Sequence, residues 1–229
     1  MKILVIIPAY NESEAIEKVV KEVYDQKIEG LDVMVVNDCS KDDTYEKAKN
    51  SSAKIVVDSP NNLGIGGTVQ TGYLYAYKND YDIAIQVDGD GQHDPKYLRD
   101  LIDSIQEGND MVIGSRFVKK SQYKQTFFRM LGIRMISLAI LIGTRRKIYD
   151  TTSGFRAANK KIIKEFVCRY PYDYPEPCTT MNVLKKKYKV AEIPVEMKKR
   201  ETGKSSISPL KSIMYMFKVI LYLLIQGIF

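Results

Sequence analysis

Short apolar runs alternate with longer amphipathic segments through the first half of the chain. The apolar runs have the length of buried β-strands, and one intervening segment carries apolar residues at helical spacing, at Ile16, Val20 and Val23. The pattern predicts strands over residues 2–7, 32–36, 54–57 and 83–87, and helices over 14–26, 42–50 and from the glycine-rich turn at 61–67 to about 78. Such alternation is typical of a mostly parallel sheet with helices on both faces, so the predicted fold class is α/β.

The second half of the chain is less regular. It predicts a helix over residues 96–106, a last core strand over 110–114 and a strongly apolar helix at Phe127–Ile142 that carries Arg129 and Arg134. An apolar helix with arginines is typical of a segment that lies in a membrane interface, with its basic groups toward the lipid head groups. A helix buried in the core would have a similar composition, and this alternative stays open.

The C-terminal segment, Ile207–Phe229, is apolar but is interrupted by Lys211 and Lys218. The uninterrupted stretch after Lys218 is shorter than the roughly 20 residues that a membrane-spanning helix needs. We therefore expect no transmembrane helix in this segment, and expect it to dock on a membrane interface or on a small separate membrane protein.

Composition and charge limit the kinds of partner. The 229 residues are 45% hydrophobic and 28% charged, which fits one compact domain. The net charge of +7 implies an anionic partner, which could be nucleic acid, a membrane surface or a phosphorylated substrate. The 16 tyrosines are not interleaved with basic residues on one face, which argues against nucleic acid.

Three widely spaced cysteines without a Cys-x-x-Cys pair indicate neither a disulfide framework nor a structural zinc site, and favour a reducing cytoplasm.

The most informative motif is Asp88-Gly89-Asp90-Gly91-Gln92, which stands where an apolar strand ends. Ligands of open α/β sheets bind at the carboxyl ends of the strands, so these residues are placed to meet a substrate. The glycines let the two carboxylates converge, and together with the Gln92 oxygen they form a set of hard ligands suited to Mg²⁺ or Mn²⁺. Such a cation would stabilise the charge on a departing nucleoside diphosphate. A solvated acidic turn uses the same residue types, and the strand context and the neighbouring motifs argue against it.

Two glycine-containing segments do not match nucleotide motifs of other enzyme classes. Asn61–Gly67 lacks the Gly-x-Gly-x-x-Gly spacing and a following acidic residue, which excludes a Rossmann dehydrogenase. Gly203-Lys204-Ser205 would need a glycine at position 198 to form a P-loop, and Lys198 stands there, which excludes a P-loop ATPase.

Three motifs together resemble glycosyltransferase family 2. Ile7-Pro8-Ala9-Tyr10-Asn11-Glu12 is similar to the opening motif of that family, Val36–Thr44 is similar to its Asp-Asp-Gly-Ser-x-Asp-x-Thr loop, and Asp88-Gly89-Asp90 matches its metal motif. The extension to Gln92-His93 and the segment Asp150–Arg156 resemble the polyprenyl-phosphate branch, with its dolichyl-phosphate mannose synthases and undecaprenyl-phosphate glucosyltransferases. The resemblance implies a GT-A fold, which is Rossmann-like, plus membrane-interface helices at the C-terminus.

The resemblance also implies which residues act. Those expected to hold the nucleotide sugar are Pro8, Tyr10, Glu12, Asp38, Gly64, Asp88 and Lys204. Those expected in catalysis are Asp90, Arg116, Arg134, Asp150 and Arg200, and the expected metal ligands are Asp88, Asp90 and Gln92. The arginines would bind the acceptor phosphate, because a guanidinium fork matches phosphate oxygens, and a surface ion pair is the alternative for each of them. The loop over residues 198–206 would close over the donor diphosphate.

Three positions need separate comment. Asn37 replaces the first acidic residue of the second motif, which leaves Asp38 to contact the base. Ile65 follows Gly64 where the family usually has a basic residue, which removes a phosphate contact. The sole histidine, His93, is expected to make a structural hydrogen bond, since an acceptor phosphate is already an anion and needs little help from a base.

The implied reaction is the inverting transfer of a hexose from a nucleotide sugar to a polyprenyl phosphate such as undecaprenyl phosphate. The hexose would be glucose, N-acetylglucosamine or mannose, and a UDP-sugar is favoured as donor. A family 2 enzyme acting on another acceptor, such as a growing polysaccharide, is the alternative.

The implied organisation is a GT-A catalytic domain over residues 1–206, with an interface helix at 127–143, and a docking segment over 207–229. We expect a peripheral or monotopic protein at the cytoplasmic face of the cell membrane, with homo-oligomerisation left open.

Overall fold

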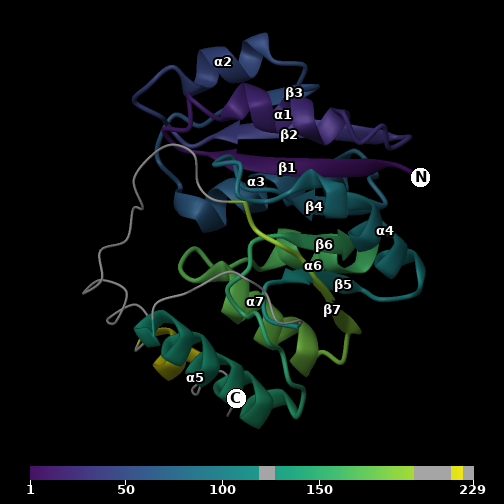
Figure 1. Ribbon diagram of the computed structural model, residues 1–229, viewed down its shortest axis with the longest axis vertical. Helices are drawn as coiled ribbons and strands as arrows, with labels where there is room; N and C mark the ends of the chain where they lie inside the picture. Colours follow the sequence, from purple (N-terminus) through teal and green to yellow (C-terminus); the bar gives the residue numbers. More distant parts are fainter. Residues whose placement is uncertain (119–126, 199–217, 224–229) are drawn as a thin grey trace.

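The computed structural model describes residues 1–118, 127–198 and 218–223, with the backbone alone for 127–129. In these parts of the chain seven strands form one sheet, in the order β3-β2-β1-β4-β6-β5-β7 (Figure 1). The strands are β1 (Ile3–Ala9), β2 (Leu31–Asn37), β3 (Ile55–Asp58), β4 (Ile83–Gln86), β5 (Met111–Ser115), β6 (Arg156–Asn159) and β7 (Val190–Pro194). β6 runs antiparallel to β4 and β5, and the other neighbouring pairs are parallel, so the predicted mostly parallel sheet is confirmed.

β1 is an interior strand, and all seven of its residues are buried. A parallel strand with both faces covered has a continuous apolar sequence, which explains why Ile3–Ala9 shows no alternation of polar and apolar residues. β1 pairs in parallel with β2 on one side and with β4 on the other. The loops that follow these three strands therefore leave the sheet at the same edge.

The helices cover both faces of the sheet, as predicted. One face packs against α1 (Ile16–Tyr24), α2 (Thr44–Asn50) and α4 (Leu98–Gln106), the last preceded by a 3₁₀ turn at Pro95–Tyr97. The other face packs against α3 (Gly64–Lys78), α6 (Lys160–Cys168), α7 (Pro175–Lys185) and α5 (Phe127–Thr144). In α1 the residues at helical spacing are the buried ones, which is why the sequence pattern located this helix correctly.

The far end of the sheet differs from the prediction. The prediction that residues 110–114 form the last core strand is wrong, because β6 and β7 follow β5 in the chain and flank it on both sides. β6 consists of Arg-Ala-Ala-Asn, and β7 is half-buried along its length, so neither has a strong apolar run. Pairing with strands that are distant in the sequence makes these segments strands, and their own residue pattern does not reveal it.

Helix α5 has one buried and one exposed face. Ile136 and Ile140 are buried in the apolar core that α5 shares with α7, and Ile133 is also buried, whereas Leu138 is 55% and Ile142 66% exposed. The core-helix alternative describes the buried face, and a membrane interface at the exposed face stays a prediction. Among the helices that the structure describes, none is long and apolar enough to cross a membrane.

The predicted docking segment lies outside the described residues except for 218–223. These six residues are helical, and Val219 and Leu223 are buried in the same core as Ile136 of α5. Figure 1 draws this short helix beside α5, at the end of the molecule opposite α2.

Candidate active site

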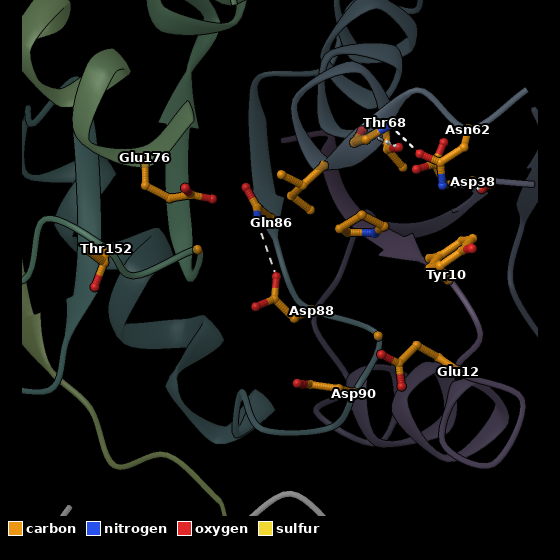
Figure 2. Close-up of a pocket in the computed structure, with 16 residues that line it drawn as sticks. Tyr10, Glu12, Asp38, Asn62, Thr68, Gln86, Asp88, Asp90, Thr152 and Glu176 are labelled. Carbon is orange, nitrogen blue, oxygen red and sulfur yellow. Dashed lines mark hydrogen bonds between the residues drawn. The ribbon is translucent and has the colours of Figure 1, made fainter. Parts of the chain in front are cut away.

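A cavity of about 510 Å³ opens at the carboxyl edge of the sheet (Figure 2), a size that falls within the range of small-molecule sites, roughly 300–1,000 Å³. Figure 2 shows the side chains around it in three groups. The β1 wall is formed by Tyr10, Glu12, Asp38, Asn62 and Thr68. The α7 wall, on the opposite side, is formed by Thr152 and Glu176, and the central strip between the walls by Gln86, Asp88 and Asp90. The lining is completed by Pro8, Ala9, Gly64, Ile65, Gly89 and Gly154.

The central strip begins at the end of β4 and is held by the histidine. The Asp88 backbone N–H donates to His93 Nδ1 at 2.9 Å, and His93 Nε2 lies 3.5 Å from Asp88 Oδ2. The His93 ring is buried and stacks on Phe155, with 4.8 Å between the ring centroids. The predicted structural hydrogen bond of His93 is confirmed, and it fixes the backbone at Asp88.

Two glycines let neighbouring loops approach the central strip. A Cβ at Gly89 would lie 3.0 Å from the carbonyl oxygen of Pro8, near the end of β1. A Cβ at Gly154 would lie 2.7 Å from Gln86 Nε2 and 3.1 Å from Asp88 Oδ1. Any larger residue at position 154 would push the loop that enters β6 away from the strip, so the cavity depends on close backbone approach at this point.

The carboxylates of Asp88 and Asp90 face the cavity. Asp88 Oδ1 accepts from Gln86 Nε2 at 3.2 Å, and Asp90 Oδ1 accepts from the Gln92 backbone N–H at 3.0 Å. Across the described parts of the chain, no three His, Cys, Asp or Glu side chains gather as metal ligands. Two hard carboxylates at an open cavity fit a cation of the Mg²⁺ type, which usually takes its other ligands from water and substrate phosphates. Asp88 and Asp90 therefore fit a cation site whose remaining ligands come from water and from the phosphates of the substrate.

Asp38 organises the β1 wall. Its backbone N–H donates to the Ala9 carbonyl at 2.9 Å, and its buried carboxylate accepts from the Leu63 N–H at 2.6 Å. The Asn62 side chain donates to the Asp38 carbonyl at 3.2 Å. These bonds join the loops after β1 and β2 to the start of α3. Tyr10 is 42% exposed on the same wall, so its ring is open to stacking.

Asn37, the residue that departs from the family pattern, has a local partner. Its Nδ2 donates to Asp58 Oδ1 at 2.6 Å, at the point where the two residues pair between β2 and β3. An aspartate at position 37 would face the carboxylate of Asp58, and the amide avoids that repulsion.

Arg156 holds the α7 wall against the sheet. It is 2% exposed and pairs with Gln86 across the antiparallel β4–β6 ladder. Its guanidinium donates to the backbone carbonyls of Thr151, Ser153 and Glu176 and to the hydroxyls of Thr179 and Thr180, at 2.6 to 3.3 Å. One buried arginine therefore ties the loop before β6 and the first turn of α7 to the end of β4.

Glu176 supplies the acidic group of the α7 wall. It stands between Pro175 and Pro177 in the first turn of α7, where proline is compatible with the helix and fixes the backbone. Burial raises the pKa of its carboxyl, the charge of Arg156 partly offsets this rise, and the charge of Asp88 adds to it.

Arg116 and Asp150 form a buried pair behind this wall. Arg116 Nε and Nη2 donate to the two carboxylate oxygens of Asp150, each at 2.7 Å, and Nη2 also donates to the Thr152 hydroxyl at 2.9 Å. Glu192 accepts from the backbone N–H groups of Tyr149 and Asp150. The pair is not the surface ion pair considered from sequence, and it places Thr152 on the cavity wall.

The structure brings only part of the predicted site together. The predicted residues that line the cavity are Pro8, Tyr10, Glu12, Asp38, Gly64, Asp88 and Asp90. Those described but not lining it are Gln92, Arg116, Asp150 and Arg134, the last exposed on α5. Arg200 and Lys204 lie outside the described residues. The roles of all these side chains stay predictions.

Five polar residues of the cavity were not among the predicted site residues: Asn62, Thr68, Gln86, Thr152 and Glu176. Gln86 did carry a signal, because it is a polar residue at the end of an otherwise apolar strand and two positions before Asp88. Glu176 carried almost none, because nothing in the sequence shows that the first turn of α7 faces the end of β4.

A mostly parallel sheet with helices on both faces and paired aspartates at its carboxyl edge defines the class of GT-A glycosyltransferases. The chain belongs to glycosyltransferase family 2: the model described as Glycosyl transferase family 2 matches residues 4–167. This finding confirms the resemblance inferred from the three motifs.

Named relatives agree with this assignment, and a solved structure agrees with the fold. The chain is 35% identical to a dolichol-phosphate mannosyltransferase of Pyrococcus furiosus, over 90% of this chain and 59% of the relative. It is 28% identical to a UDP-N-acetylglucosamine–dolichyl-phosphate N-acetylglucosaminyltransferase of Methanococcus voltae, over 85% of this chain and 84% of the relative. The fold matches glucosyl-3-phosphoglycerate synthase of Mycobacterium tuberculosis, solved with Mn²⁺, UDP and phosphoglyceric acid, with a TM-score of 0.72, 19% identity and coverage of 99% of this chain and 78% of that one.

Proposed function

We propose that this chain transfers a hexose from a nucleotide sugar to a polyprenyl phosphate at a membrane surface. The observation that carries the proposal is the cavity at the sheet edge, where one wall offers Tyr10 and Asp38 and the central strip offers Asp88 and Asp90. The named relatives that act on dolichyl phosphate support the acceptor, and they differ in the sugar that they carry.

The β1 wall would bind the nucleotide. Tyr10 presents a ring to a base, and the Asp38 carboxylate has acceptor capacity beyond its bond to the Leu63 N–H. Because these groups are fixed by the loops after parallel strands, the base and ribose would be held before the reaction begins. A UDP-sugar is the favoured donor, as in the UDP-bound structural neighbour.

Asp88 and Asp90 would hold a divalent cation, Mg²⁺ or Mn²⁺, together with the donor diphosphate. When bound, the cation stabilises the negative charge that develops on the leaving nucleoside diphosphate. The hydrogen bonds from Gln86 and Gln92 orient the two carboxylates. A structural neighbour was crystallised with Mn²⁺ and UDP, which supports a divalent cation as part of the proposal.

The reaction would be an in-line displacement with inversion. An oxygen of the acceptor phosphate forms the new bond to the anomeric carbon as the bond from that carbon to the diphosphate breaks. The acceptor is already an anion, so no residue needs to remove a proton from it. Arg134, Arg200 and Lys204 are our candidates for charge contacts to the acceptor and the diphosphate, and Arg116 with Asp150 would hold Thr152 in place.

The exposed face of α5 would contact the membrane. Leu131, Met135, Leu138 and Ile142 form an exposed apolar stripe on this helix. Arg134 lies exposed on the same helix, and three exposed basic residues, Arg145, Arg146 and Lys147, follow its end. An apolar stripe beside basic groups suits a bilayer with anionic lipids, as for a peripheral or monotopic protein on the cytoplasmic face.

A donor panel tests the activity. Undecaprenyl phosphate and Mn²⁺ are supplied with UDP-glucose, UDP-N-acetylglucosamine or GDP-mannose, and the labelled sugar is followed into the lipid phase. We expect a glycolipid from at least one donor and none from undecaprenol, which lacks the phosphate. Transfer to a polysaccharide with none to the lipid would replace the proposal by the alternative acceptor class.

Liposome flotation tests the membrane surface. Replacing both Leu138 and Ile142 by Glu removes apolar area from the exposed face of α5, and we expect binding to anionic liposomes to fall by about tenfold. The matched control replaces Leu74 and Tyr77, which are exposed on α3, by Glu. Equal loss in both variants would contradict a specific role for α5.

A further inference from the structure

Gln86 carries a buried acceptor that the protein itself leaves without a donor. Gln86 is 1% exposed, and its Nε2 donates to Asp88 Oδ1 at 3.2 Å. The opposite amide orientation would set an oxygen against the Asp88 carboxylate, so this bond fixes Oε1 on the side away from Asp88. Among the described residues Oε1 has no hydrogen-bond partner. A buried carbonyl oxygen without a donor costs about 1–3 kcal/mol, so its presence on a cavity wall points to a donor brought by a ligand.

Glu176 presents a second acceptor to the same cavity. In Figure 2 its carboxyl group extends from the α7 wall toward Gln86. Its backbone carbonyl accepts from Arg156 Nη1 at 2.8 Å, from the Thr179 hydroxyl at 3.1 Å and from the Thr180 hydroxyl at 2.7 Å. The backbone that carries this side chain is therefore held firmly, as expected of a group that selects a ligand.

The charges in the cavity limit what these acceptors can bind. Glu176 lies close enough to Asp88 for the charge of Asp88 to raise the pKa of Glu176. A diphosphate or an acceptor phosphate beside Glu176 would add a further negative charge there, and the charge of Arg156, whose guanidinium already donates to five oxygens, only partly offsets the acidic charges. A neutral group with several O–H donors satisfies both Gln86 and Glu176 without that cost. In a nucleotide sugar this group is the sugar ring.

We propose that Gln86 and Glu176 form a subsite that accepts hydrogen bonds from the hydroxyl groups of the transferred hexose and determines which hexose is used. The subsite rests on the proposed function, because a nucleotide sugar must occupy the cavity. It assigns the sugar to the α7 side of the central strip and the nucleotide to the β1 wall. Selectivity would follow because a sugar that lacks a matching hydroxyl leaves buried acceptors unpaired.

Binding measurements separate this subsite from the transfer reaction. Calorimetry with Mn²⁺ gives the dissociation constants of UDP and UDP-glucose, and of GDP and GDP-mannose, for the unaltered chain and for Glu176→Gln. We expect the diphosphate alone to bind within about twofold of the parent. The affinity that the sugar adds should fall by about 10-fold to 100-fold, the usual effect of losing hydrogen bonds to a charged acceptor. The matched control is Glu165→Gln, since Glu165 pairs with Lys186 and Tyr188 outside this cavity.

The outcomes distinguish the two proposals. An unchanged ratio of diphosphate to nucleotide-sugar affinity in folded Glu176→Gln overturns the subsite, whether or not sugar reaches polyprenyl phosphate. A reduced ratio with no transfer to the lipid supports the subsite and removes the proposed acceptor. Should Glu176→Gln not fold, Gln86→Met provides the same test, because methionine keeps the length of the side chain and removes the acceptor. For that variant too, an unchanged ratio overturns the subsite.

Discussion

The β1 wall and the α7 wall of the cavity are built in different ways. The β1 wall consists of the loops that directly follow β1, β2 and β3, together with the start of α3, so a strand end in the sequence already gives the place of most of its residues. The α7 wall is reached through antiparallel β6, whose first residue, Arg156, pairs with Gln86 and ties Glu176 to the sheet. The comparison teaches that one wall is encoded by local order along the chain and the other by a buried polar network.

A change in the central strip, which lies between the two walls, should have the largest effect on the rate of sugar transfer. Replacing Asp90 by Asn removes one of two carboxylates that would hold the cation, and we expect kcat/KM for sugar transfer to fall by about 10³-fold. Excess chelator should have a comparable effect on the unaltered chain. The measurement is the initial rate of glycolipid formation with the donor found in the panel.

The matched control for this change is Asp94→Asn. Asp94 belongs to the same loop but accepts from the Lys96 N–H and lies outside the cavity lining. We expect its rate to stay within about threefold of the parent. Equal losses in the two variants would mean that the loop as a whole, rather than the paired carboxylates, supports the reaction.

Removing the arginine that holds the α7 wall should have the next largest effect, and this effect should be a lower free energy of unfolding. Arg156→Met removes the donors that satisfy three buried carbonyls, and we expect about 3 kcal/mol less free energy of unfolding. Urea denaturation measures this change. UDP binding by the folded fraction should change little, because the β1 wall does not depend on Arg156.

Lys160→Met is the control for this prediction. Lys160 is the first residue of α6, and its ammonium makes exposed ion pairs with Asp80 and Asp82 at 3.8 and 3.5 Å. Its loss should alter stability by no more than about 0.5 kcal/mol. If Arg156→Met were equally mild, the polar network would not be what holds the α7 wall.

The same contrast explains which features could be predicted from the sequence. Strands β1 to β5 and helices α1 to α5 were predicted because each has its own apolar run or helical spacing. Asp88 and Asp90 were predicted because ligands of open α/β sheets bind at the carboxyl ends of the strands, and Asp38 was predicted from the resemblance of its loop to the family motif. β6 and Glu176 were not, because only the pairing of Gln86 with Arg156 brings them to the cavity, and such long-range pairing leaves little trace in the local sequence.

The smallest expected effect comes from adding a charge beside the β1 wall at Ile65, one of the two positions where this chain departs from the family pattern. Ile65 is 44% exposed, lines the cavity and stands in the first turn of α3, so a lysine there can reach an anion without displacing core residues. Ile65→Lys should tighten UDP binding by about threefold at low salt, since an exposed charge pair contributes less than about 1 kcal/mol, and the gain should shrink as salt screens it. Tyr77→Lys adds the same charge to the exposed surface of α3 outside the cavity lining and corrects for the change in net charge. The same variant tests whether the two walls bind separate parts of the donor. Because the charge added in Ile65→Lys acts on the diphosphate and not on the sugar, the difference in affinity between UDP and UDP-glucose should stay as it is in the parent. If that difference changed as much as in Glu176→Gln, the two walls would not bind separate parts of the donor, and the division between nucleotide and sugar sides would be wrong.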